Sequence, residues 1–173
     1  STDENLKQEY KGNNLDLHTD FIFAYPSYNV RNTEIGGILG IRQLKRLDAN
    51  IVCRTKNLIR FFQGIDPKKY RIDFKLEGSS NYAFNLILKN ANNDFAQRLM
   101  KKMNEKSIEF RRGSAGGGNQ LRQPYLKSVI PEYHYKNFPE VEHIHFYGFY
   151  IGNYPDLKSR EVDDICQILN SVE

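Results

Sequence analysis

The sequence predicts an α+β fold, in which a small and mostly antiparallel sheet packs against helices. Two kinds of segment support this class: some stretches carry apolar residues at helical spacing, and shorter ones alternate apolar and polar residues. Their order is helix, helix, strand, strand, helix, strand, helix, strand and helix, which fits an α+β layer. The 173 residues are enough for one ordinary domain with its own core.

The first third of the chain is expected to pass from irregular structure into two helices. Residues 1–20 are polar, contain a Gly-Asn-Asn turn signal and show no sustained period, so we expect them to be irregular and partly mobile. DFIFAYPSYNV follows as a short extended piece. One helix is expected from Asn32, which can cap it, and a second from Asp48 to about Gly64.

The first of these helices contains three glycines, Gly36, Gly37 and Gly40. Each disfavours a helix by about 1 kcal/mol relative to Ala. Small residues also let another backbone come close. We therefore expect this helix to pack tightly against a partner element, such as another subunit.

The remainder of the chain is expected to build the sheet and its covering helices. YRIDFKLEG and NYAFNLILKN alternate apolar and polar residues and predict two antiparallel strands. Asn92 or Asn93 is expected to cap a helix that runs to about Lys106, and SIEFRR to form a third strand. A polar and aromatic connection, a helix from about Glu140, a short strand FYIG and a helix over residues 159–171 complete the order.

Composition indicates the compartment and the partners. The chain has 25 Lys and Arg against 21 Asp and Glu, mixed without a polybasic block, so nucleic acid is not an expected partner. The sequence contains no apolar run of bilayer-spanning length and no secretory leader pattern, so no membrane partner is expected either. Cys53 and Cys166 are expected to be small buried side chains of a reducing compartment, which favours the cytoplasm.

One stretch, RRGSAGGGNQLRQP over residues 111–124, is the strongest candidate for a site, and we call it the glycine loop. Glycine-rich backbone can point successive N–H groups at an anion, and nearby Arg side chains add donors. The stretch matches neither the P-loop pattern nor the dinucleotide-binding pattern G-x-G-x-x-G. A mobile surface loop and an anion site both remain open from this stretch alone.

A metal site is not expected. His143 and His145 would share a face in a strand, but in a helix they diverge by about 200°. The sequence has no third ligand at plausible spacing. Asp163 and Asp164 are most simply the solvated face of a helix.

Three stretches, in order along the chain, resemble the DegT/DnrJ/StrS family of vitamin-B6-dependent enzymes, which comprises sugar-nucleotide aminotransferases and their dehydratase relatives. PSYNVRNTEIGGILGIRQLKRL resembles the family signature of Tyr-Asn-x-Arg followed by Glu, small residues, Gly and Gln-Leu. KSIEFRRGSAGGGNQLRQPYLKS resembles the C-terminal strand and loop of the branch that removes the sugar 3-hydroxyl. FYIGNYPDLKSREVDDICQIL is similar to the closing strand, Pro-x-Leu turn and last helix.

The resemblance implies the C-terminal small domain of a fold-type I enzyme. In the family, the large domain with the cofactor ring and the reacting Lys or His precedes these motifs, and no counterpart is present here. We therefore expect a C-terminal fragment: residues 1–31 lead from the large domain, residues 32–64 are connecting and dimer-contact helices, and residues 65–173 form the small domain. No catalytic residue is expected in this chain, which alone should be inactive.

The resemblance also implies binding residues. Asn29 is expected to reach across a homodimer to the phosphate of pyridoxal 5'-phosphate or pyridoxamine 5'-phosphate, and Arg31 to support it. The alternatives are an Asn that satisfies backbone groups at a helix entrance and an Arg in a salt bridge. The pocket of a nucleotide-sugar substrate is expected to be lined by Arg111, Gly118, Asn119, Arg122 and Gln123.

The implied function is the conversion of a nucleotide-linked 4-keto-6-deoxy sugar, for surface polysaccharide such as the lipopolysaccharide O-antigen. The glycine loop favours 3-dehydration. Amino transfer is the alternative, and it would require a Lys where a dehydratase has a His. A further alternative is a non-catalytic RNA- or nucleotide-binding module, but the sequence lacks the RNP-like motif that the RNA reading predicts.

Overall fold

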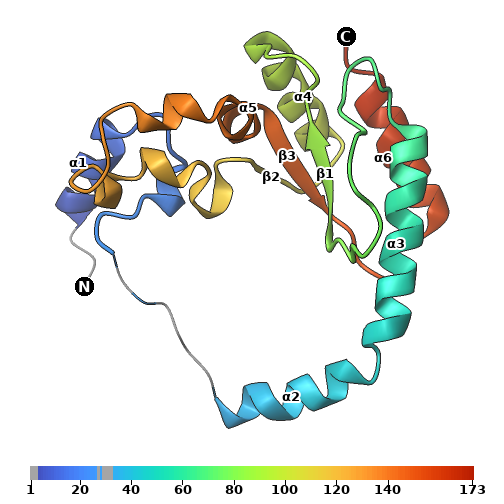
Figure 1. Ribbon diagram of the computed structural model, residues 1–173. Coiled ribbons are helices and arrows are strands. Elements are labelled where there is room, and N and C mark those ends of the chain that lie inside the picture. Colours follow the sequence, from blue (N-terminus) through green and yellow to red (C-terminus); the bar gives the residue numbers. More distant parts are fainter. Residues whose placement is uncertain (1–3, 27, 29–32) are drawn as a thin grey trace. The chain divides into compact units, whose positions relative to one another are not determined.

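The computed structural model describes residues 4–26, 28 and 33–173, and the contacts of these residues form two compact units. The first unit combines Ser1–Tyr28 with Arg111–Gly148, and the second combines Asn29–Phe110 with Phe149–Glu173. The expected division by function into residues 1–31, 32–64 and 65–173 is a different kind of division and stays a prediction. Figure 1 shows the course of the chain through both units.

The first unit is built from two α-helices and several short turns of 3-10 helix. Its described elements are α1 (Glu4–Asn13), η1 (Thr19–Phe21), η2 (Ala115–Gly117), η3 (Gln120–Arg122), η4 (Pro124–Leu126), η5 (His134–Asn137) and α5 (Pro139–Tyr147). The expectation that residues 1–20 are irregular is wrong for α1. Its sequence is rich in Glu, Lys and Gln, which are good helix formers, and Glu4 and Lys11 suit the helix dipole at the two ends.

The second unit holds the longer helices. They are α2 (Glu34–Leu44), α3 (Leu47–Gly64), α4 (Asn93–Glu105) and α6 (Ser159–Asn170). The predicted cap of α4 is confirmed, because the Asn92 side chain accepts a hydrogen bond from the Phe95 N–H at 2.9 Å. The buried residues of α6 are Val162, Cys166 and Leu169, and their spacing gives one apolar face.

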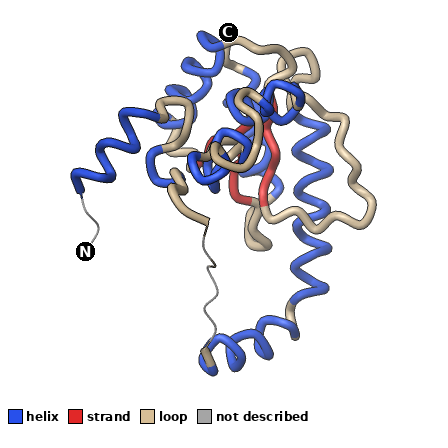
Figure 2. Tube along the Cα trace, turned by 60° about the vertical axis from the view of Figure 1, so that its left-hand side comes forward, coloured by secondary structure: helices blue, strands red, loops and turns tan. Residues whose placement is uncertain are grey.

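The sheet has three strands in the order β1-β3-β2, and the predicted α+β class with a small antiparallel sheet is confirmed. The strands are β1 (Ala83–Ile87), β2 (Phe110–Arg112) and β3 (Gly148–Gly152). The strand predicted from YRIDFKLEG is wrong: it is reduced to a single bridge between Tyr70 and Leu88, and Figure 2 draws the segment between α3 and β1 as loop. Its Phe74 instead stacks on Phe62 of α3 at 4.9 Å between ring centroids, so its alternating pattern serves contact with a helix.

The core of the second unit is apolar. Helix α6 packs against α3, which lies beside it in Figure 1, and against α4. Phe61 of α3 stacks on Phe84 of β1 with ring centroids 4.5 Å apart. The buried Tyr70 donates its hydroxyl to the carbonyl of Leu169 at 2.8 Å, so its polar atom is satisfied.

Helix α2 presents apolar side chains that the rest of the described chain does not cover. Its exposed apolar residues are Ile35, Ile38, Leu39, Ile41 and Leu44. Within the described residues, nothing lies within 4 Å of a Cβ placed on Gly37 or Gly40. The expected tight packing of this helix against a partner element therefore stays a prediction.

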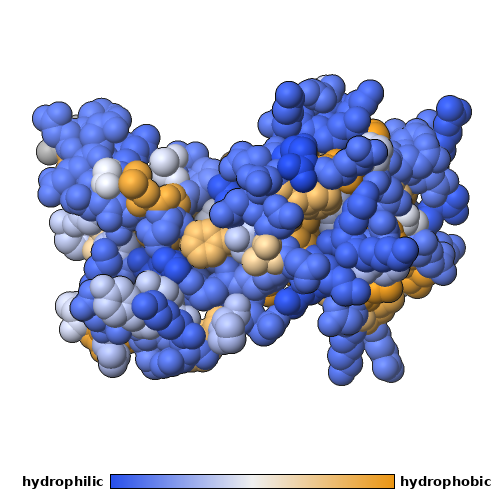
Figure 3. Space-filling model, turned by 90° about the horizontal axis from the view of Figure 1, so that it is seen from above, coloured by the Kyte–Doolittle hydropathy of each residue, from blue (hydrophilic) through white to orange (hydrophobic). Residues whose placement is uncertain are grey.

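Two expectations about the whole chain can be compared with the structure. Cys166 is buried as expected, but the expectation for Cys53 is wrong, because it lies exposed on α3. Among the described residues, the structure contains no helix that is both long enough and apolar enough to cross a membrane. The face shown in Figure 3 is mostly hydrophilic, with hydrophobic side chains in separate groups.

Candidate functional site

The glycine loop lies in the first unit, where β2 leads into η2, η3 and η4. A Cβ on Gly113 would collide with the carbonyl oxygen of Ile144, and a Cβ on Gly118 would collide with the imidazole of His145. Gly118 also has a φ of 57°, which favours glycine. The loop backbone thus lies directly against α5, and its conformation requires glycine at these two points.

Arg122 is the centre of a charged cluster behind the loop. Its guanidinium donates to both carboxylate oxygens of Glu142, and its Nη1 donates to the Asp16 carboxylate at 2.6 Å. The guanidinium carbon also lies 3.9 Å from the centre of the Tyr135 ring. With its side chain only 13% exposed, Arg122 is enclosed by two acids and an aromatic ring.

This cluster shifts the protonation of its members. Hydrogen bonding to Glu142, and then to Asp16, raises the pKa of Arg122 although burial opposes it. Burial alone would raise the pKa of Glu142, but hydrogen bonds from Arg122 and Asn119 outweigh burial and lower it. Both groups are therefore charged at neutral pH and satisfy each other.

Asn119 joins the loop to α5. It is 2% exposed, and its side-chain amide donates to Glu142 Oε1 at 2.6 Å while its Oδ1 caps η3 through the Leu121 N–H. Its backbone N–H donates to Nδ1 of the buried His145 at 3.0 Å. Burial lowers the pKa of this histidine, so the imidazole is neutral in the fold at pH 7.

Gln123 ties the end of the loop to the N-terminal segment. Its Oε1 accepts the Phe23 N–H at 2.9 Å, and its Nε2 donates to the Phe21 carbonyl at 2.9 Å. The side chain is fully buried, so these bonds are made away from water. The amide acts here as a bridge between two backbone groups separated from it by about a hundred residues.

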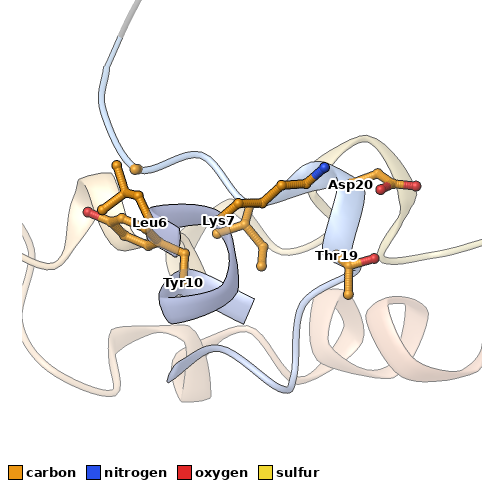
Figure 4. Close-up of a pocket in the computed structure, with 7 residues that line it drawn as sticks. Leu6, Lys7, Tyr10, Thr19 and Asp20 are labelled. Carbon is orange, nitrogen blue, oxygen red and sulfur yellow. The ribbon is translucent and has the colours of Figure 1, made fainter. Parts of the chain in front are cut away.

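Two hollows lie within the first unit. One of about 440 Å³ is lined by Arg122 and Asp16, with Lys127, Tyr133 and Tyr135. Another of about 320 Å³ lies where α1 contributes Leu6, Lys7 and Tyr10 and η1 contributes Thr19 and Asp20 (Figure 4). Both are open and mixed in polarity, and in the first Arg122 and Asp16 are already paired with each other.

The structure treats the expected site residues unequally. Asn29 and Arg31 lie outside the described residues. Arg111 is exposed, whereas Gly118, Asn119, Arg122 and Gln123 are buried or half-buried against other parts of the first unit. The structure therefore brings the last four together as a support for the loop, and the contact of all five with substrate stays a prediction.

Several members of this cluster were missed by sequence reasoning. Asp16, Glu142 and Tyr135 lie far from the loop in sequence, and no local pattern connects them to Arg122. The spacing of Glu142 and His145 did contain a usable signal, because residues three apart share one face of the predicted helix. Both histidines considered for a metal lie on α5, and no cluster of three metal-ligating side chains occurs among the described residues.

Comparison with known proteins defines first the fold and then the family. The chain superimposes on an aminotransferase from Psychrobacter cryohalolentis with a TM-score of 0.63 at 19% identity, over 85% of this chain and 42% of that one, which shows an aminotransferase-type fold. The model of the DegT/DnrJ/EryC1/StrS aminotransferase family matches residues 3–170. The chain belongs to this family, and the predicted resemblance is confirmed.

Two relatives that match by sequence are named 3-dehydratases. The chain is 35% identical over 154 residues to GDP-4-keto-6-deoxy-D-mannose 3-dehydratase from Yersinia pseudotuberculosis. The matched region covers 86% of this chain and 38% of the relative. The solved Escherichia coli enzyme of that name, with bound hydrated PLP, superimposes with a TM-score of 0.69 at 28% identity, over 87% of this chain and 39% of that one. This chain thus spans about two fifths of the length of these relatives.

Proposed function

We propose that this chain is the C-terminal part of a pyridoxal or pyridoxamine phosphate-dependent enzyme that removes the 3-hydroxyl of a nucleotide-linked 4-keto-6-deoxy sugar. The 35% identity to the Yersinia 3-dehydratase over 154 residues carries this proposal. The fold agrees, because the chain matches the Escherichia coli enzyme of that name with a TM-score of 0.69. A related solved structure of a 3-dehydratase variant holds the nucleotide sugar GDP-perosamine, which supports a GDP-linked sugar as the substrate.

The described residues do not form a cofactor site by themselves. The half-buried cation of the first unit, Arg122, already donates to the carboxylates of Glu142 and Asp16, so these acids would compete with a phosphate for it. Asn29 and Arg31, which we propose for the cofactor phosphate across a homodimer, lie outside the described range. We assign the cofactor ring and the reacting Lys or His to the part of the relatives that this chain does not match.

The contribution of this chain is a wall of the substrate pocket. Arg111 has an exposed guanidinium that can pair with a substrate diphosphate. Asn119, Arg122 and Gln123 have their side-chain donors and acceptors occupied by Glu142, Asp16 and backbone groups, so they would act mainly by holding the loop that carries Arg111 and Gly118. The glycine loop would then be an ordered wall.

Amino transfer is the second candidate, because the matching family is described as an aminotransferase family. The two reactions differ in the residue at the cofactor, where a Lys would favour transfer and a His dehydration. We further propose that the full-length enzyme is a cytoplasmic homodimer that serves surface polysaccharide synthesis. The molecular mass of the full-length enzyme in solution would test whether it is a homodimer.

The test uses the full-length enzyme with GDP-4-keto-6-deoxymannose, pyridoxal phosphate and glutamate. Dehydration gives a product that lacks the 3-hydroxyl, whereas amino transfer gives one that keeps it and carries an amine at C4. Arg111→Met should lower turnover and leave the absorbance of the bound cofactor unchanged, while Arg160→Met, an exposed arginine on α6, should change neither. An aminated product would reject dehydration, and an unaffected Arg111 variant would reject the pocket wall.

A further inference from the structure

His145 contacts the glycine loop through a hydrogen bond that fixes its tautomer. Its Nδ1 lies 3.0 Å from the backbone nitrogen of Asn119, and its Nε2 lies 2.7 Å from the carbonyl oxygen of Asp16. A backbone N–H can only donate and a carbonyl can only accept, so Nδ1 is unprotonated and Nε2 carries the proton. His145 is therefore neutral and links two segments that are more than a hundred residues apart.

Helix α5, which carries His145, makes a second contact with Asn119. Glu142, three residues before His145 on α5, accepts from the Asn119 side chain at 2.6 Å. The preceding residue, Gly118, leaves no space for a Cβ beside the imidazole. Backbone, side chain and a neighbouring glycine of the loop are thus all fitted to one face of α5.

The charged groups around His145 come from two helical elements and from the segment before η1. Glu142 lies on α5, Arg122 comes from η3, and Asp16 precedes η1. Arg122 is paired with both acids. Protonation of His145 would place a positive charge beside that of Arg122. It would also turn Nδ1 into a donor that faces the Asn119 N–H. Protonation therefore opposes both the charged cluster and the contact with the loop.

We propose that His145 is a positioning residue, which holds the glycine loop at Asn119 in the conformation that meets the nucleotide sugar. The role of the loop towards substrate rests on the proposed function. The hold of His145 on the loop rests on the hydrogen bonds alone. Loss of the bond should raise KM more than it lowers kcat, because the reacting groups lie elsewhere.

Two variants separate the two nitrogen atoms. In His145→Asn the side-chain oxygen takes the place of Nδ1 and can still accept from the Asn119 N–H, while the link to Asp16 is lost. In His145→Gln the amide nitrogen takes the place of Nε2 and can still donate to Asp16, while the acceptor for Asn119 is lost. Each variant removes one bond and serves as the control for the other.

The first readout is hydrogen exchange at the Asn119 amide in this 173-residue chain. We expect exchange to be about tenfold faster in His145→Gln and close to wild type in His145→Asn. Equal protection in both variants would overturn the proposal whatever reaction the enzyme catalyses.

The second readout is turnover by the full-length enzyme. We expect a several-fold higher KM in His145→Gln with most of the wild-type value retained in His145→Asn. A freed loop with unchanged KM would overturn the role towards substrate. If wild-type enzyme converts no GDP-linked keto sugar at all, the proposed function fails, and the exchange result still decides the hold on the loop.

Discussion

The two units of this chain differ in the side chains that they mainly bury, although the second also buries the polar Asn57 and Asn153. The apolar core lies in the second unit, and Leu17 is the one buried apolar side chain among the described residues of the first. The first unit instead buries Asn14, Ser114, Asn119, Gln123 and His145, each with hydrogen-bonding groups. Apolar packing tolerates small changes of shape, whereas a buried polar network needs every partner in place. The conformation of the unit that carries the glycine loop is therefore set more by specific hydrogen bonds than by apolar packing.

The largest effect is expected in the apolar core. Phe84→Ala removes a fully buried ring that stacks on Phe61, so it should lower the free energy of unfolding of the second unit by about 3 to 5 kcal/mol. Tyr82→Ala, nearby and 68% exposed, should cost below about 1 kcal/mol. Urea unfolding of the wild-type chain and the two variants measures these losses of unfolding free energy. Similar losses for both variants would contradict the view that buried apolar packing stabilises the second unit.

The next effect concerns the buried cluster of the first unit. Arg122→Met leaves Glu142 and Asp16 without their cation, and we expect a loss of about 2 to 4 kcal/mol, because these acids are only partly exposed to water. Arg60→Met removes the cation of an exposed pair with Asp163 in the second unit and should cause no measurable loss. Residue-resolved unfolding compares the two, and a cost for Arg60→Met equal to that of Arg122→Met would contradict the account.

A smaller effect should separate the units by pH. The lowered pKa of His145 means that the unfolded chain takes up its proton first, so stability of the first unit falls as pH drops below the ordinary value of 6.5. The lowered pKa of Glu142 adds to this loss below about 4.5. Acid should therefore weaken the first unit before the second.

Alkali should act on the second unit instead. Burial raises the pKa of Cys166 to about 12 and also raises that of Tyr70, so the folded chain keeps protons that the unfolded chain releases. Stability there is complete below the ordinary value of 9.0 for the thiol and falls as pH rises above it. Amide protection followed from pH 7 in both directions checks this pair of expectations, and simultaneous loss in both units at both extremes would contradict them.

How well each part could be predicted depended on how far apart along the sequence its interacting residues lie. Helices α4 and α6 could be predicted because local spacing and an Asn cap determine them. The segment YRIDFKLEG has the alternation of a strand, but its partner is a helix, and a pattern of period two cannot distinguish the two partners. The glycine loop was found from its composition and its expected role from the resemblance, yet the acids that hold Arg122 lie 20 and 106 residues away along the chain and carry no local signal.

The central claim is that the glycine loop is an ordered part of the first unit, held by Asn119, Arg122 and Gln123. Backbone NMR order parameters of residues 113–123 in this 173-residue chain test it most directly. The account predicts values of about 0.85, equal to those of α5, because each of these three side chains is bonded to a group outside the loop. Values below about 0.6 across the loop, with α5 rigid, would contradict it and would make RRGSAGGGNQLRQP a mobile linker.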